Sequence, residues 1–182
     1  MEKKSIVRLD RVTAVYNGPI ESVVYNGGEL QNGWVVEVGD LAGGNRDLRE
    51  AVKPTAKKRV ALIAHPEIRY EEYTKADAAL EKFSVEAGKA ARAYILAPTD
   101  IVSISNEGLT LLDSKAVKDN VVVLEENSFK LKEMAVGSLT GDEVFVADII
   151  DVEKIGTNTV VGQPGAVGRV NELVVIQVRK NG

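Results

Sequence analysis

The feature that most constrains this chain is a succession of short, β-prone runs, most of them ended by glycine, asparagine or a charged residue. The runs lie at residues 5–9, 12–16, 22–25, 34–38, 60–64, 91–96, 101–105, 109–112, 121–124, 129–134, 144–150 and 173–178. β-Branched side chains favour the pleated, half-buried surface of a sheet. Turn sequences such as Asn32-Gly33 are typical of hairpins. The pattern predicts a mainly β, β-rich α+β fold, an antiparallel barrel or sandwich of short strands.

One segment has helical rather than strand spacing. Thr74 and Asp77 resemble a capping box, in which side chains satisfy backbone groups at the start of a helix. The apolar residues that follow share one helical face: Ala76, Ala79, Leu80 and Phe83. The sequence therefore predicts one short helix beginning near Thr74. We also expect 121–124 and 129–134 to pair as neighbouring strands.

The pattern loosens between Leu41 and Lys58, where glycines and charged residues replace the apolar runs. This stretch predicts no regular element and suits either an exposed, partner-binding loop or an ordinary surface connection. It also suggests a division into residues 1–56, an N-terminal strand and loop unit or arm, and residues 57–182, a barrel-like domain with one short helix. A single domain is the alternative.

Charge and composition exclude several classes of function. The net charge is −4, so no global basic field would attract nucleic acid, which we disfavour as a partner. The chain has no cysteine, hence no disulfide and no thiolate metal site. No apolar run approaches the roughly 20 residues that cross a bilayer, and the N-terminus lacks a signal-peptide pattern. We expect a protein made in the cytoplasm and no membrane partner.

Motifs for catalysis are missing from the sequence. The single histidine, His65, accompanies no Gly-x-Ser-x-Gly nucleophile motif. Neighbouring carboxylates such as Asp142-Glu143 would point to opposite faces of a strand, and Asp148 with Asp151 lacks calcium-loop spacing. The glycine-rich stretch 162–168 has no Lys-Ser/Thr pair for a phosphate loop. We predict no catalytic residue, no cofactor and no metal site.

Four stretches in the centre of the chain resemble structural proteins encoded among the head genes of tailed bacteriophages of Gram-positive bacteria. They are Asn32-Gly-Trp-Val-Val-Glu-Val-Gly-Asp-Leu41, Val60-Ala-Leu-Ile-Ala-His-Pro-Glu67 with Tyr70, Ala87-Gly-Lys-Ala-Ala-Arg-Ala-Tyr94, and Asp100-Ile-Val-Ser103. The resemblance covers about half of the chain and does not extend past Val144. It implies a capsid decoration or minor head protein, located in the virion, that binds the major capsid protein as an oligomer and stabilises the shell.

We expect contacts with the capsid in three segments, which we select for their glycine content and charge. The candidate residues are Ile6, Val7, Arg8, Leu41, Arg46, Arg49, Gln163 and Arg169. Other virion roles stay open, namely a head fibre base, an internal head protein or a connector component. A carboxylate- or metal-dependent β-barrel hydrolase would instead require acidic side chains around His65 in one pocket. A small-ligand-binding barrel would require an apolar cavity lined by the valine-rich strands.

Overall fold

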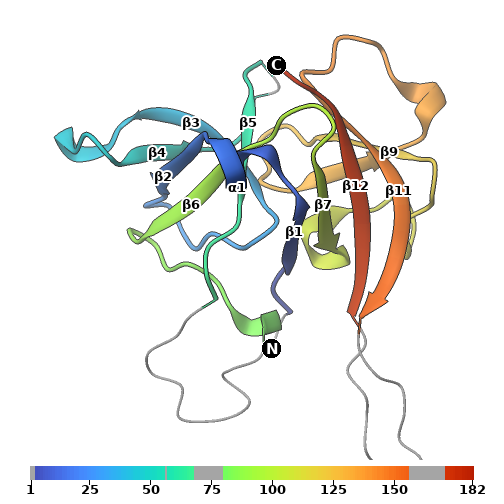
Figure 1. Ribbon diagram of the computed structural model, residues 1–182, viewed down its shortest axis with the longest axis horizontal. Coiled ribbons are helices and arrows are strands. Elements are labelled where there is room, and N and C mark those ends of the chain that lie inside the picture. Colours follow the sequence, from blue (N-terminus) through green and yellow to red (C-terminus); the bar gives the residue numbers. More distant parts are fainter. Residues whose placement is uncertain (1–2, 56, 68–79, 156–170) are drawn as a thin grey trace, which may run out of the picture.

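The computed structural model describes residues 3–55, 57–67, 80–155 and 171–182, which form a small barrel beside a curved open sheet (Figure 1). The strands are β1 (Val7–Arg11), β2 (Ile20–Val24), β3 (Val35–Leu41), β4 (Arg49–Val52), β5 (Val60–Ile63), β6 (Ala90–Ile95), β7 (Ile101–Ser105), β8 (Leu109–Thr110), β9 (Val121–Leu124), β10 (Leu131–Met134), β11 (Phe145–Ile155) and β12 (Asn171–Asn181). The helices are α1 (Thr13–Asn17) and the 3-10 turns η1 (Ala42–Gly44), η2 (Leu80–Lys82), η3 (Asn106–Gly108) and η4 (Val136–Ser138).

The first unit is a closed barrel with the strand order β2-β4-β3-β5-β6. The pairs are antiparallel except β2 with β4, which is parallel. Side chains fill the barrel interior: Val23, Leu30, Val36, Ala51, Ala61, Ile63, Phe83, Val85, Ala91, Ala93 and Phe129. A ring this small leaves room for packed side chains rather than for a channel.

The second unit is a seven-stranded sheet, curved into a half-barrel, with the order β1-β7-β12-β11-β9-β10-β8. Its two longest strands, β11 and β12, run side by side from Phe145↔Asn181 to Ile155↔Asn171 and extend well beyond β9 (Figure 1). The strands β1 and β8 form its two edges.

The two units share one core, and β5 shows how. Val60 and Leu62 pack into the cluster between the barrel and the half-barrel, whereas Ala61 and Ile63 face the barrel interior. All four are at most 1% exposed. A strand buried on both faces needs an unbroken apolar run, which is what residues 60–63 supply. The half-barrel contributes Phe145, Ile176 and their neighbours to the same cluster.

The predicted fold class is confirmed, because the described part of the chain is mainly β, with a closed barrel, a half-barrel and one α-helix. The predicted pairing of 121–124 with 129–134 is also confirmed, by the antiparallel β9–β10 ladder from Leu124↔Leu131 to Val121↔Met134.

The prediction of a strand at 12–16 is wrong, because Thr13–Asn17 is the helix α1. The Asp100 carboxylate accepts hydrogen bonds from the backbone N–H and the hydroxyl of Thr13, at 2.9 and 2.7 Å. Val12 and Ala14 are buried in the core shared by the two units. These long-range contacts outweigh the weak local preference of the run for a strand.

The stretch in which we predicted no regular element contains η1 and the strand β4. The register of β4 is set by β3 on one side and by β2 on the other, through pairs such as Val38↔Ala51 and Val23↔Arg49. The suggested division after residue 56 falls between β4 and β5, which belong to the same barrel. The start of the helix predicted near Thr74 lies outside the described residues. In the stretch that follows, up to Gly88, Leu80–Lys82 is the 3-10 turn η2 rather than part of an α-helix.

Candidate functional site

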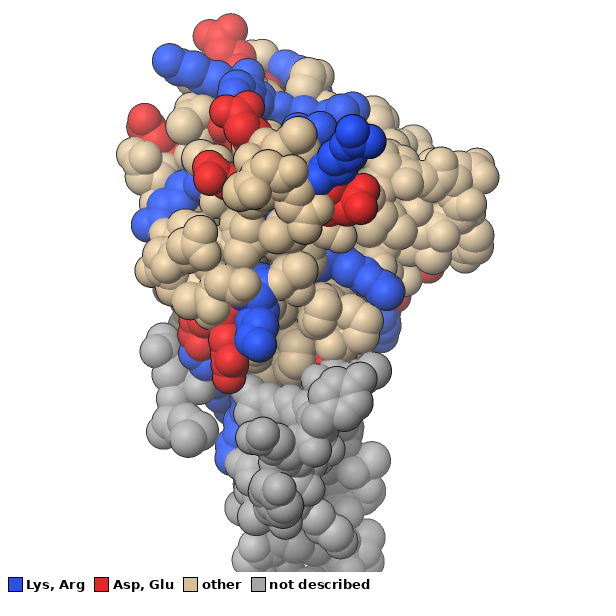
Figure 2. All heavy atoms as spheres, turned by 90° about the vertical axis from the view of Figure 1, so that its left-hand side faces the viewer, with Lys and Arg blue, Asp and Glu red and all other residues tan. Residues whose placement is uncertain are grey.

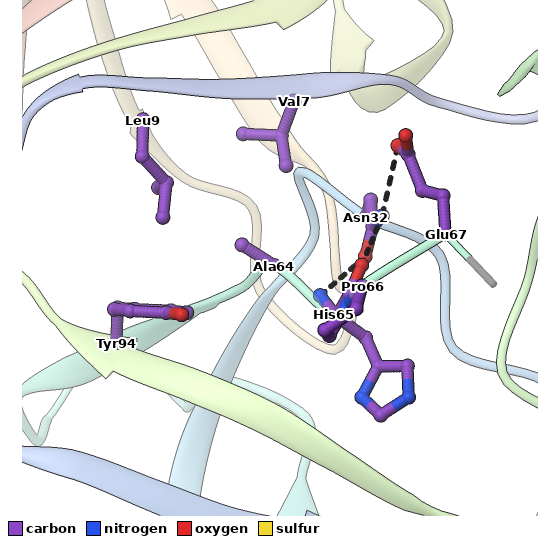
Figure 3. A pocket seen from close by; sticks show the side chains of 8 residues that line it. All are labelled: Val7, Leu9, Asn32, Ala64, His65, Pro66, Glu67 and Tyr94. Atoms are coloured by element: carbon purple, nitrogen blue, oxygen red, sulfur yellow. Dashed lines mark hydrogen bonds between the residues drawn. The ribbon is translucent and has the colours of Figure 1, made fainter. Parts of the chain in front are cut away.

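A pocket of about 240 Å³ opens on the outer side of the barrel, between the edge strand β1 and the ends of β5 and β6. Its lining residues are Val7, Leu9, Asn32, Ala64, His65, Pro66, Glu67 and Tyr94 (Figure 3). Val7 and Leu9 are two residues apart on β1, so their side chains point to the same side of the strand. One wall is therefore apolar, and the polar groups come from the segment that leaves β5.

Asn32 fixes that polar segment. Its side chain is buried, and its nitrogen donates hydrogen bonds to the His65 carbonyl oxygen at 3.0 Å and to Glu67 Oε1 at 3.2 Å. Its Oδ1 accepts a hydrogen bond from the His65 N–H at 2.8 Å. The next residue, Gly33, adopts a φ of +84°, which favours glycine, and its N–H bonds to the Ile63 carbonyl oxygen at 2.8 Å. The Asn-Gly turn thus holds the backbone of residues 65–67 at the pocket.

His65 and Glu67 do not form a catalytic pair. The imidazole of His65 points away from the pocket and lies parallel to the Phe83 ring, with 6.2 Å between the ring centres, whereas Glu67 extends toward β1 (Figure 3). Burial lowers the pKa of His65, and the nearby Arg92 lowers it further, so its neutral form is favoured. Its Nδ1 is buried and has no hydrogen-bond partner in the described part of the chain. The described lining of the pocket offers neither a polarised histidine nor a second carboxylate for hydrolysis.

Glu67 is the unusual ionisable group of the pocket. Burial raises its pKa, and a hydrogen bond from Asn32 lowers it by less. Glu29, another partly buried carboxylate, is stabilised in the usual way, by hydrogen-bond donors and a cation. Burial raises the pKa of Glu29 too, but hydrogen bonds from Lys4, Ser84 and Gln31 outweigh that effect and lower it overall. Glu67 has no such cation among the described residues.

The fully buried carboxylates serve backbone structure at separate places in the molecule. Glu37 accepts from the Thr55 N–H and hydroxyl, at 2.7 and 2.8 Å. Asp100 accepts from Thr13, as above, and from the Ala97 N–H at 2.8 Å. Glu133 accepts from backbone and amide donors of the loop between β8 and β9. Glu37 lies on β3, Glu133 on β10 and Asp100 just before β7, and each of these carboxylates holds a different segment of the chain.

The candidate residues on β1 and just before it are largely engaged within the molecule. Ile6 is buried, and its N–H donates to the Ser105 hydroxyl at 3.0 Å. Val7 lines the pocket. The Arg8 guanidinium pairs with Asp10 and, at 2.8 Å, with Glu153 of β11. Of these three, Val7 alone contributes to the pocket.

The candidates of the second segment lie around the β3–β4 connection, at the far end of the barrel from the half-barrel (Figure 1). Leu41 is 46% exposed and Arg46 is exposed. Arg49 lies 3.7 Å from the Glu21 carboxylate and donates to the Gly39 carbonyl oxygen at 3.4 Å. The structure does not bring this group together with β1. Gln163 and Arg169 lie outside the described residues.

Arg49 also lines a second, polar pocket of about 260 Å³, together with Glu21, Val38, Lys58, Arg59, Val60 and Ile95. On this side of the barrel Lys and Arg side chains are interspersed with Asp and Glu (Figure 2). Such mixing breaks up the positive potential that a nucleic-acid surface needs.

Sequence reasoning named Val7 but missed Asn32, Glu67 and Tyr94 as pocket residues. The signal within reach was the Asn32-Gly33 turn together with His65-Pro66, two interruptions that flank buried strands. Within the described ranges, no group of three or more metal-ligating side chains is present. No helix in the same ranges is long and apolar enough to cross a membrane.

Comparisons with protein-family models, with curated protein sequences and with solved structures find no match for this chain.

Proposed function

We propose that this chain is a non-enzymatic structural protein of a tailed-phage head, which binds the major capsid protein and stabilises the shell as a homo-oligomer. The observation that carries the proposal is a repeated arrangement: a buried carboxylate holds a surface segment that exposes apolar side chains. Such an arrangement suits a protein whose product is an interface, because rigid apolar groups lose little entropy on binding.

The loop of residues 111–120 is the clearest case. Glu133 is fully buried and accepts hydrogen bonds from the backbone N–H groups of Leu112 and Val117, at 3.2 and 2.9 Å. It also accepts one from the Asn120 side chain at 2.7 Å. The side chains of Leu112 and Val117 are nevertheless 57% and 52% exposed. Burying a carboxylate costs free energy, so the use of Glu133 as the acceptor indicates that a defined conformation of this loop is important for function.

The helix α1 and the end of β4 repeat the arrangement. Asp100 holds Thr13 at the start of α1, whose Tyr16 is 79% exposed. Glu37 holds Thr55, three residues after the exposed Val52. Tyrosine is among the residues that contribute most to protein interfaces. The exposed apolar groups on fixed segments therefore favour protein binding over chemistry.

The setting in the virion, with assembly in the host cytoplasm, follows from the resemblance of residues 32–41, 60–67, 87–94 and 100–103 to phage head proteins. The copies would bridge neighbouring capsid subunits. An interface of about 1,600 Å² suffices for specific binding, and repetition around a closed shell adds avidity.

The test is quantitative mass spectrometry of purified virions of the phage that encodes the chain. A ratio near one copy per major capsid subunit supports shell decoration. A handful of copies assigns the chain to a fibre base, an internal protein or the connector, and absence from the particle overturns a virion role.

A second test addresses the carrying observation. Purified shells lacking the protein are mixed with the wild type or with the double variant L112S/V117S. We expect the double variant to bind at least tenfold more weakly, because it removes two desolvated apolar contacts. The matched control K115S, in the same loop, should bind as the wild type does; equal binding of all three excludes this loop from the interface.

A further inference from the structure

The described residues leave one carboxylate of the pocket beside β1, that of Glu67, without a cation partner. Glu67 is half-buried, its one hydrogen bond comes from the neutral Asn32 side chain, and no cation pairs with it among the described residues. Glu29, which is also partly buried, is paired with Lys4. A desolvated carboxylate without a counter-ion costs free energy, which a cation that enters the pocket recovers.

The walls of the pocket define what kind of cation fits. Val7, Leu9, Ala64 and the Tyr94 ring offer apolar surface, and the carboxylate lies at one end (Figure 3). Small-molecule sites usually measure about 300–1,000 Å³. The 240 Å³ here is smaller, about the space of eight water molecules at roughly 30 Å³ each. That room suits one long side chain rather than a cofactor.

We propose that this pocket receives a lysine side chain of a partner protein, with the methylene chain against Val7, Leu9 and Tyr94 and the ammonium group on the Glu67 carboxylate. The inference rests on the proposed role in protein binding and names the partner chemistry at one place on the surface. Lysine combines a long apolar stem with a compact charge, and buries the stem readily along apolar surface.

The carboxylate geometry favours lysine over arginine. Arginine pairs best with two free carboxylate oxygens, through two parallel hydrogen bonds. Glu67 Oε1 already accepts the Asn32 amide at 3.2 Å, so Oε2 is the oxygen that has no partner among the described residues. An ammonium group needs only one such contact, since it acts as a point charge.

The test uses the full-length protein and the capped amino acid N-acetyl-lysine methylamide as the probe. Binding is followed by the backbone amide shifts of residues 7–9 and of Ala64, His65 and Glu67 in NMR titrations. We expect saturable shifts with a millimolar Kd, as befits a single side chain. The variant E67Q should bind at least fivefold more weakly, whereas E86Q, which removes the same charge from an exposed position, should match the wild type.

Three results would overturn the proposal: no saturable shift, equal binding of the uncharged N-acetyl-norleucine methylamide, or E67Q binding as well as the wild type. Tighter binding of N-acetyl-arginine methylamide would reassign the pocket to arginine, and tighter binding of cadaverine would reassign it to a free diamine. The titration uses the isolated protein and no virions. A chain that is absent from virions but binds the lysine probe is therefore distinguishable from a virion protein that does not bind it.

Discussion

Glu133 illustrates how much of this fold depends on single buried carboxylates. In the run 129–134, alternation places Phe129, Leu131 and Glu133 on one face and Lys130 with Lys132 on the other. The structure follows that alternation, with Leu131 and Glu133 buried and Lys132 exposed. A carboxylate in the apolar register of a strand was therefore a readable sign of a buried acceptor. Its donors, in the loop of residues 111–120, could not be read from the strand.

We predict that E133A lowers the free energy of unfolding by about 3 kcal/mol, because three donors lose their buried acceptor. Urea denaturation followed by circular dichroism measures the change. The exposed neighbour Glu126 supplies the control, since E126A should change stability by less than about 0.5 kcal/mol. A loss below 1 kcal/mol for E133A would show that water replaces the carboxylate.

Glu143 should titrate at an unusually low pH although it is exposed. The backbone N–H of Thr140 is the largest cause, and the N–H of Glu143 itself, the Thr140 hydroxyl and the Gly141 N–H add to it, lowering the pKa to about 2. Because the folded pKa lies below the unfolded value, the stabilisation is complete above about pH 4.5 and is lost as the pH falls toward 2.

Carboxyl NMR of Glu143 checks this prediction. The variant T140A removes the hydroxyl donor but keeps the N–H groups, so its midpoint should rise and stay below the ordinary glutamate value. A wild-type midpoint near 4.5 would contradict the hydrogen-bonded turn.

At the scale of elements, Phe129 is the residue through which the β9–β10 hairpin enters the barrel. Its ring stacks on Trp34, with ring centres 5.4 Å apart, and meets Tyr25 edge-on at 5.0 Å. Its carbonyl oxygen accepts the Val35 N–H at 2.8 Å, at the first residue of β3. The hairpin therefore closes the barrel core although its strands belong to the half-barrel.

We predict that F129A destabilises the protein by about 3–5 kcal/mol, the usual cost of deleting a buried phenylalanine. Trp34, the single tryptophan of the chain, should emit at longer wavelength because water reaches its ring. Urea unfolding and emission spectra test both effects. F129L, which retains apolar volume, should recover much of the stability; an unchanged spectrum for F129A would mean that the hairpin is not seated in the barrel.

At the scale of the whole molecule, the barrel and the half-barrel are joined by their shared core and by the end of β12. The Asn181 side chain exchanges hydrogen bonds with the Val60 backbone, each 2.9 Å, and donates to the Leu96 carbonyl oxygen at 2.8 Å. The last strand of the half-barrel is thereby attached to β5 and to the end of β6. Neither unit could bury its facing surface alone.

We therefore predict a single cooperative unfolding transition for the whole chain. The Trp34 emission reports the barrel and far-ultraviolet circular dichroism reports both units, and their urea transitions should coincide. Two separate midpoints would show that the barrel is independently stable.

The sequence by itself determined the strand content, because β-branched runs and glycine turns act through local sterics that every residue carries with it. It also located the strands β5 and β12, because residues 60–64 and 173–178 are apolar, β-prone runs. Only the tertiary structure decided that 13–17 is helical, that 49–52 is a strand, and that the barrel closes on β2. Those outcomes depend on partners such as Asp100 and β3, distant along the chain. The pocket had the same origin, because β1, the Asn32 turn, the end of β5 and Tyr94 meet only when long-range pairing brings them together.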